Sequence, residues 1–181
     1  MKCRNLISSV FSSLFMVLTG SYNGAVYAGG CFDDSQMPAT TPDNRFDDLG
    51  DGTIRDKITG LMWKKCVQGM DFNTDCATGT LVVKTWQEAL QNADNESFSG
   101  VSDWRLPNKN ELFSIVESRC AEPSINWTIF PNADGSKQWT STHWYGHDTA
   151  LQAIVVFFRN GTIENTNAGN VHAFRLVRGG R

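Results

Sequence analysis

Residues 45–63, RFDDLGDGTIRDKITGLMW, contain two turn signals followed by an apolar run. Asp51-Gly52 lies between alternating segments, a pattern typical of a β-hairpin turn. A second turn at Thr59-Gly60 leads into Leu61-Met62-Trp63, which is predicted to form a buried strand. This stretch therefore predicts a domain that opens with short antiparallel strands.

Two helices are predicted after these strands. Thr85 and Glu88 have the spacing of a capping box, and apolar residues then recur at helical spacing, which predicts a helix near 86–94. Asn108 and Glu111 repeat the cap, which predicts a second helix near 109–118. Beyond Gly135 the pattern predicts strands at 138–142, 153–159, 162–165 and 171–178, with Asn160-Gly161 as a hairpin turn. Strands, then helices, then strands indicate an α+β fold.

Composition limits the class of protein. The chain has 181 residues, enough for one domain, and 40 % of them are hydrophobic and 19 % charged. Six Trp and eleven Phe exclude disorder for most of the chain, because disordered segments have few aromatic residues. The net charge of −3 argues against nucleic acid as a partner.

The first 28 residues have the features of a secretory signal peptide. Lys2 and Arg4 precede an apolar run of 13 residues at 6–18, and Ala28 provides a small residue for cleavage. A membrane anchor is the alternative, although the apolar run is short for a bilayer. Cleavage leaves 153 residues with a net charge of −5, because the segment carries two basic residues and no acidic ones. We expect an exported protein (periplasmic, at the cell surface or extracellular) with no stable membrane span, an extended arm at 29–43 and a domain at 44–181.

Four cysteines remain after cleavage: Cys31, Cys66, Cys76 and Cys120. An even number in an exported chain predicts disulfides, and four cysteines allow three pairings. Proximity favours Cys66–Cys76, which flank a short polar loop, and Cys31–Cys120 would then tie the arm to the middle of the chain. The rival interpretation is a zinc site, but the sequence has no C-x₂-C spacing and its histidines lie far from the cysteines.

Motifs that would indicate catalysis or a cofactor are weak. The acidic stretch 47–56 suggests a calcium loop, but its spacing does not match an EF-hand and an Asp-Gly turn accounts for the same residues. His143, His147 and Asp148 lie close together in an expected loop, without a metal-binding motif. No G-x-S-x-G motif or phosphate-binding loop occurs. We therefore expect a non-enzyme without cofactor or bound metal.

The segment DWRLP at 103–107 precedes the second predicted helix. We expect Trp104 and Leu106 to be buried and Arg105 to pair with a carboxylate such as Glu111. Contact with a ligand is the alternative role. Asn95, Asn126 and Asn160 each begin a short match to the glycosylation sequon.

A set of short motifs follows in a fixed order along most of the chain. They are RF at 45–46, GDGT at 50–53, Asp56, TGLMW at 59–63, TW at 85–86, EAL at 88–90, DWRLP at 103–107, EL at 111–112, WTST at 139–142, Phe157, Gly161, Arg175 and VRGG at 177–180. The combination resembles the Lcl C-terminal domain family of bacterial proteins. The resemblance implies a C-type-lectin-like fold, with two helices against a twisted antiparallel sheet and long loops. Similar chains carry cysteines near these positions, which supports the pairing above.

The family's namesake is a collagen-like adhesin whose domain binds glycosaminoglycans and forms trimers. The present chain lacks a collagen repeat, so an oligomer is possible but unsupported, and its charge is poor for sulfated polyanions.

We expect an exported binding module that recognises a glycan or another surface ligand through loops. A protein–protein assembly module is the alternative, and an enzyme is a third class by fold analogy alone. The residues predicted to bind ligand are aromatic or polar, as sugar contacts require: His143, Trp144, Tyr145, His147, Asp148, Asn165, Asn167 and Asn170. Trp104 and Trp139 are predicted to lie in the core.

Overall fold

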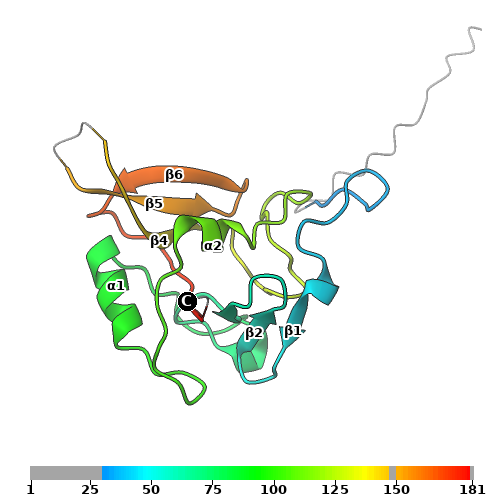
Figure 1. Ribbon diagram of the computed structural model, residues 1–181, viewed down its shortest axis with the longest axis horizontal. Helices are drawn as coiled ribbons and strands as arrows, with labels where there is room; N and C mark the ends of the chain where they lie inside the picture. The colour runs from blue at the N-terminus through cyan, green and yellow to red at the C-terminus, as the bar shows by residue number, and fades with distance from the viewer. Residues whose placement is uncertain (1–29, 147–149, 180–181) are drawn as a thin grey trace, which may run out of the picture.

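The computed structural model describes residues 30–146 and 150–179. Two antiparallel sheets and two helices make up the domain (Figure 1). The first sheet has the order β1-β2-β3-β7 and the second the order β4-β5-β6. The strands are β1 (Phe46–Asp48), β2 (Thr53–Asp56), β3 (Met62–Lys64), β4 (Lys137–Trp144), β5 (Gln152–Phe157), β6 (Thr162–Asn167) and β7 (Val177–Arg178); the helices are α1 (Trp86–Asp94) and α2 (Lys109–Phe113), with 3-10 turns at Asp43–Arg45 and Phe72–Thr74. The predicted α+β class is confirmed.

The Asp51-Gly52 turn connects β1 and β2, which pair antiparallel from Phe46↔Asp56 to Asp48↔Ile54. Gly52 has a φ of +85°, and a Cβ there would lie 2.6 Å from the Phe98 ring, so both the conformation and the space require glycine. The predicted hairpin is confirmed.

Both helices begin at the predicted capping boxes. The second helix ends at Phe113 and not near 118 as predicted. Beyond Phe113 the backbone forms hydrogen bonds between residues three apart, as in a 3-10 turn: Ile115 N–H donates to the Leu112 carbonyl and Val116 N–H to the Phe113 carbonyl. Ile115 and Val116 are still buried, which explains why their apolar spacing predicted a longer helix.

The predicted strand at 171–178 is regular only over β7. Residues in this segment change partners, because His172 bridges Lys84 and Ala173 bridges Gln138 before Val177 pairs with Trp63. Each short pairing is locally extended, so the sequence pattern of a strand is present without one continuous ladder.

Two clusters of buried apolar side chains form the interior. Strand β5 contributes to both, since Val156 faces the first cluster and Val155 the second. The first is built around Trp63, Phe130 and Phe158, and the second around Trp104, Trp139 and Phe174. Trp104 and Trp139 are therefore core residues, as predicted.

Two disulfides, Cys31–Cys120 and Cys66–Cys76, have the predicted pairing. Next to the first, the carboxylate of Glu117 accepts hydrogen bonds from the backbone and hydroxyl groups of Thr40 and Thr41. The arm is thus fixed to the domain by a covalent bond and by a buried carboxylate. Among the described residues, no helix is long and apolar enough to cross a membrane.

Candidate functional site

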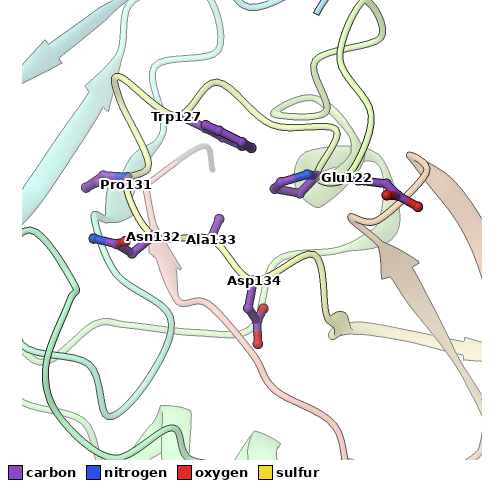
Figure 2. A pocket seen from close by; sticks show the side chains of 7 residues that line it. Glu122, Trp127, Pro131, Asn132, Ala133 and Asp134 are labelled. Atoms are coloured by element: carbon purple, nitrogen blue, oxygen red, sulfur yellow. The ribbon is translucent and has the colours of Figure 1, made fainter. Parts of the chain in front are cut away.

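A surface cavity of about 520 Å³ lies in the long segment between α2 and β4. Figure 2 shows the Trp127 ring on one side of it and Asn132, Ala133 and Asp134 along the opposite side. Trp127 is 46 % exposed, whereas Trp63, Trp104 and Trp139 are buried. The remaining lining residues are Glu122, Pro123 and Pro131.

Contacts on either side of Trp127 hold its ring outward. Asn126 donates its side-chain amide to the Thr41 carbonyl and to Asp43, both at 2.7 Å, and its side-chain oxygen accepts from Thr128 N–H. Phe130 is fully buried and meets Phe46 edge to face at 5.6 Å. The indole therefore lies between two anchored positions. The Asn126 amide is used in these bonds, which argues against glycan attachment at this sequon.

The other end of the cavity segment is fixed to the hairpin between β5 and β6. Glu122 N–H donates to the Arg159 carbonyl at 2.8 Å, and a Cβ on Gly135 would lie 3.3 Å from Arg159 Cα. Gly135 has a φ of +69°, so this close approach requires glycine. The cavity walls are therefore held by contacts distant in sequence.

Two of the residues that line the cavity, Glu122 and Asp134, carry carboxylates. Glu122 pairs with Arg159 at 3.0 Å, and both side chains are more than 60 % exposed, so the pair adds little stability. Asp134 accepts one hydrogen bond, from Ser136 N–H at 2.9 Å, and in the described part of the chain no cation lies within ion-pair distance of it. Asn132 donates its amide to the Asp75 carbonyl at 2.8 Å. A cavity of about 80 Å³ shares Pro131, Asn132 and Asp134 with the first and also contacts Cys76.

Arg175 is fully buried near this segment. One of its guanidinium nitrogens donates to the Lys64 carbonyl at 2.8 Å and to the Lys65 carbonyl, and its guanidinium carbon lies 4.7 Å from the Phe130 ring centroid. Burial lowers the pKa of Arg175 to about 9, while the charge of Asp134 acts in the opposite direction. Arg175 does not line the cavity.

Six of the eight residues predicted to bind ligand are described, and they lie at two places on or next to the second sheet. His143 and Trp144 were expected in a loop, but they are the last residues of β4. Between the pairs Trp139↔Val155 and His143↔Ala153, a bulge in β4 contains two more residues than the facing part of β5. Beyond this bulge the two strands pair again, and the pairing extends to Trp144. Trp144 is 47 % exposed and Tyr145 85 % exposed, and the rings of His143 and Tyr145 are 3.9 Å apart. His147 and Asp148 lie outside the described residues.

Three predicted asparagines belong to β6 or the turn that follows it. The register Trp144↔Gln152↔Asn167 places Trp144 and Asn167 in one cross-strand row. Asn165 donates to the Gln152 side chain, and Asn170 donates to the Thr166 hydroxyl at 2.8 Å. The structure therefore forms an aromatic and polar patch here, and ligand binding at this patch remains a prediction.

The segment 103–107 has the structural role that its sequence suggested. Trp104 and Leu106 are buried, and Arg105 makes a two-pronged contact with Glu111, both bonds at 2.8 Å. The acidic turn is likewise accounted for by local bonds, since Asp51 accepts from Thr53 N–H and Asp48 from Gly50 N–H.

These features define a class: an α+β domain closed by two disulfides, with an aromatic-walled cavity in a long loop segment. The model of the Lcl C-terminal domain family matches residues 52–178, and the chain belongs to that family. A comparison with curated proteins found no match. The family match confirms the resemblance seen in the motifs and covers both the cavity and the patch.

Proposed function

We propose that this protein is a binding module that recognises a glycan in the Trp127 cavity. The observation that carries the proposal is a half-exposed indole that forms one wall of a surface cavity of about 520 Å³, with Asn132 and Asp134 among the other residues that line it. Small-ligand sites typically occupy about 300–1,000 Å³. An aromatic ring packs against the apolar face of a sugar, while carboxylate and amide groups bond its hydroxyls.

The proposal includes a C-type-lectin-like scaffold, on which long loops bear the ligand and the sheets hold them in place. This is supported by two helices beside antiparallel sheets, two disulfides and a cavity within a loop segment. We further propose binding without turnover, so that incubation with a bound oligosaccharide would release no shorter product.

Export is part of the same proposal. Two disulfides are compatible with an oxidising compartment outside the cytoplasm. Intact-mass measurement of protein recovered after expression with residues 1–28 present is expected to give a chain that begins at Gly29. A mass that still includes those residues would contradict cleavage.

Glycan binding is tested with a glycan array and a matched pair of variants. Trp127 and Trp144 have nearly equal exposure, 46 % and 47 %, so either replacement by Ala removes a similar exposed indole. Trp127→Ala should weaken binding about tenfold or more, since aromatic contacts dominate such sites. Trp144→Ala should leave binding unchanged.

The opposite result would move the site to the β4–β6 patch. An array with no binding would favour the second candidate, a protein–protein assembly module. Trp144, Tyr145 and Leu151 support that candidate, because all three are exposed and apolar near the turn between β4 and β5. Self-association would establish it: the sedimentation coefficient should rise with protein concentration in the wild type and should not do so in Trp144→Ser.

A further inference from the structure

We propose that β6 is an interface strand, through which two copies of this chain join their second sheets edge to edge. Two sheets of three strands would then form one continuous antiparallel sheet. Three features of β6 support this pairing: an uncovered edge, backbone groups that point outward, and side chains that are compatible across the junction. The pairing does not depend on what the Trp127 cavity binds.

The other edges of the two sheets are covered or protected. Outside β4, the carbonyls of Pro107 and Ala173 accept hydrogen bonds from the strand. Outside β7, Arg105 exchanges two backbone hydrogen bonds with Val177. Strand β1 has only three residues, two of them aspartates, and short or charged edge strands resist pairing with another chain.

In the described part of the chain, nothing comparable protects β6. It is the outer strand of the second sheet (Figure 1), and it pairs with β5 over six consecutive residues without a bulge. Its sequence, TIENTN, contains no proline, lysine or arginine, and its one charge, on Glu164, is paired with Lys137 at 2.7 Å. Bulges, prolines and unpaired charges are the usual means of keeping an edge from pairing. The edge of β6 is therefore suited to receive another strand.

Alternate backbone groups of β6 point away from β5. Directly after the strand, Ala168 N–H donates to the Leu151 carbonyl, and residues bonded to the neighbouring strand recur every two positions in an antiparallel ladder. Ile163, Asn165 and Asn167 therefore direct their N–H and C=O groups outward. Among the described residues, the outward groups of Ile163 and Asn165 have no hydrogen-bond partner.

These outward groups are symmetric about Asn165. When two β6 strands run antiparallel with Asn165 opposite its copy, the two Asn165 residues exchange two bonds, and each Ile163 exchanges two with the Asn167 of the other copy. The Asn167 carbonyl also accepts from Asn170 N–H, and its second lone pair remains for this contact. Six backbone bonds result. An axis at Glu164 would leave four within the strand and would set two carboxylates opposite each other, which is unfavourable.

The side chains across the register centred on Asn165 are compatible. Glu164 lies opposite the second copy's Thr166, so no like charges meet. Ile163, which is 42 % exposed, lies opposite the second copy's Asn167 and would lose contact with water. The strand thus matches itself in hydrogen bonds and in charge, which identifies a second copy of the chain as its partner.

The test is sedimentation equilibrium of the purified protein over a series of concentrations from micromolar to millimolar. The wild type is expected to pass from monomer to dimer. Asn165→Pro removes the central N–H of each copy, and an edge strand tolerates proline where the N–H would face outward. This variant should raise the dissociation constant of the dimer about tenfold or more, because two of the six bonds are lost. Its circular dichroism should match that of the wild type.

Charge substitutions test the register, and they keep the test decisive if the proline variant does not fold. Thr166→Glu places a carboxylate opposite the second copy's Glu164, twice in the dimer, and should weaken it about threefold or more. Thr166→Lys should strengthen it. The matched control is Thr162→Glu, which adds the same charge to the same face of β6 but lies opposite Ala168, and it should change the affinity by less than about twofold.

Several results would overturn the β6 interface. They are a wild type that stays monomeric over the whole series, a dimer that Asn165→Pro leaves unchanged, and equal weakening by the two glutamate variants. Loss of the dimer in Trp144→Ser, with Asn165→Pro still dimeric, would place self-association at the Trp144 patch instead. If the wild type is monomeric and still binds a glycan through Trp127, the proposed function stands and only the interface fails.

Discussion

Glu117 joins the N-terminal arm to the domain, and its removal should be costly. The side chain is 2 % exposed. One carboxylate oxygen accepts from Thr40 N–H at 3.0 Å and from Arg119 N–H at 3.2 Å, and the other accepts from the N–H and hydroxyl of Thr41, both at 2.8 Å. In Glu117→Gln, the new NH₂ group would face donors that the lost oxygen satisfied.

The magnitude follows from the donors left without an acceptor. A hydrogen bond to a charged group contributes about 1.5–3 kcal/mol, and an unsatisfied buried donor costs about 1–3 kcal/mol. The Thr41 hydroxyl can rotate to accept from the amide, but the Thr41 backbone N–H cannot. We therefore expect the free energy of unfolding to fall by about 2–4 kcal/mol, a large part of the roughly 5–15 kcal/mol typical of a domain.

The effect should depend on pH. Burial raises the pKa of Glu117, but the hydrogen bonds from Thr40, Thr41 and Arg119 outweigh it and hold the pKa below the ordinary value of 4.5. The ionised carboxylate therefore stabilises the fold above its unfolded-state pKa, and this contribution is lost as the pH falls through the lower folded-state value. The difference between wild type and Glu117→Gln should be constant near neutral pH and should decrease in acid.

Urea unfolding followed by tryptophan fluorescence measures both quantities. The matched control is Glu122→Gln, the same substitution at an exposed ion pair, which should change stability by less than about 1 kcal/mol. A loss below about 1 kcal/mol in Glu117→Gln at neutral pH would refute the argument, as would a difference that persists unchanged in strong acid.

Other changes have equally definite outcomes. Trp104→Ala and Trp139→Ala should each lower the free energy of unfolding by about 3–5 kcal/mol, because each leaves a cavity in the core. Trp144 is exposed, so Trp144→Ala should lower it by only about 0.5 kcal/mol. Thermal melts of the three variants test this, and a melting temperature for Trp144→Ala as low as those of the other two would show that Trp144 belongs to the core. Replacing the Cys31–Cys120 pair by serine should destabilise more than replacing Cys66–Cys76, because the closed loops give roughly 4.6 and 2.7 kcal/mol in the chain-entropy model. Urea unfolding of both double variants tests the order, which equal losses would contradict.

The parts of the fold that sequence could predict depend on contacts between near neighbours. The Asp51-Gly52 turn and the two helix caps are formed by residues within a few positions of each other. The end of α2 was missed because its apolar spacing continues past Phe113, although the backbone turns there. The extension of β4 to Trp144 was missed because it depends on a bulge.

The cavity could not be predicted, because distant residues build it. Trp127 entered the sequence analysis only as part of a sequon, and its exposure depends on the bonds from Asn126 to Thr41 and Asp43. Nothing near Trp127 in the sequence encodes those partners. Two prolines at 123 and 131 around a tryptophan in an irregular segment were the available signal.

The Cys31–Cys120 bond has a mechanical consequence. If the molecule is pulled between residue 30 and residue 179, tension passes from Cys31 to Cys120 through the disulfide. The backbone of residues 32–119 is then a closed loop outside the covalent load path, which shields β1 to β3 and both helices from direct stretching. The load-bearing chain starts again at residue 121 and immediately enters the segment that carries Trp127. A tether on the N-terminal side would therefore transmit force to the cavity first, and the lifetime of a bound ligand should respond to it.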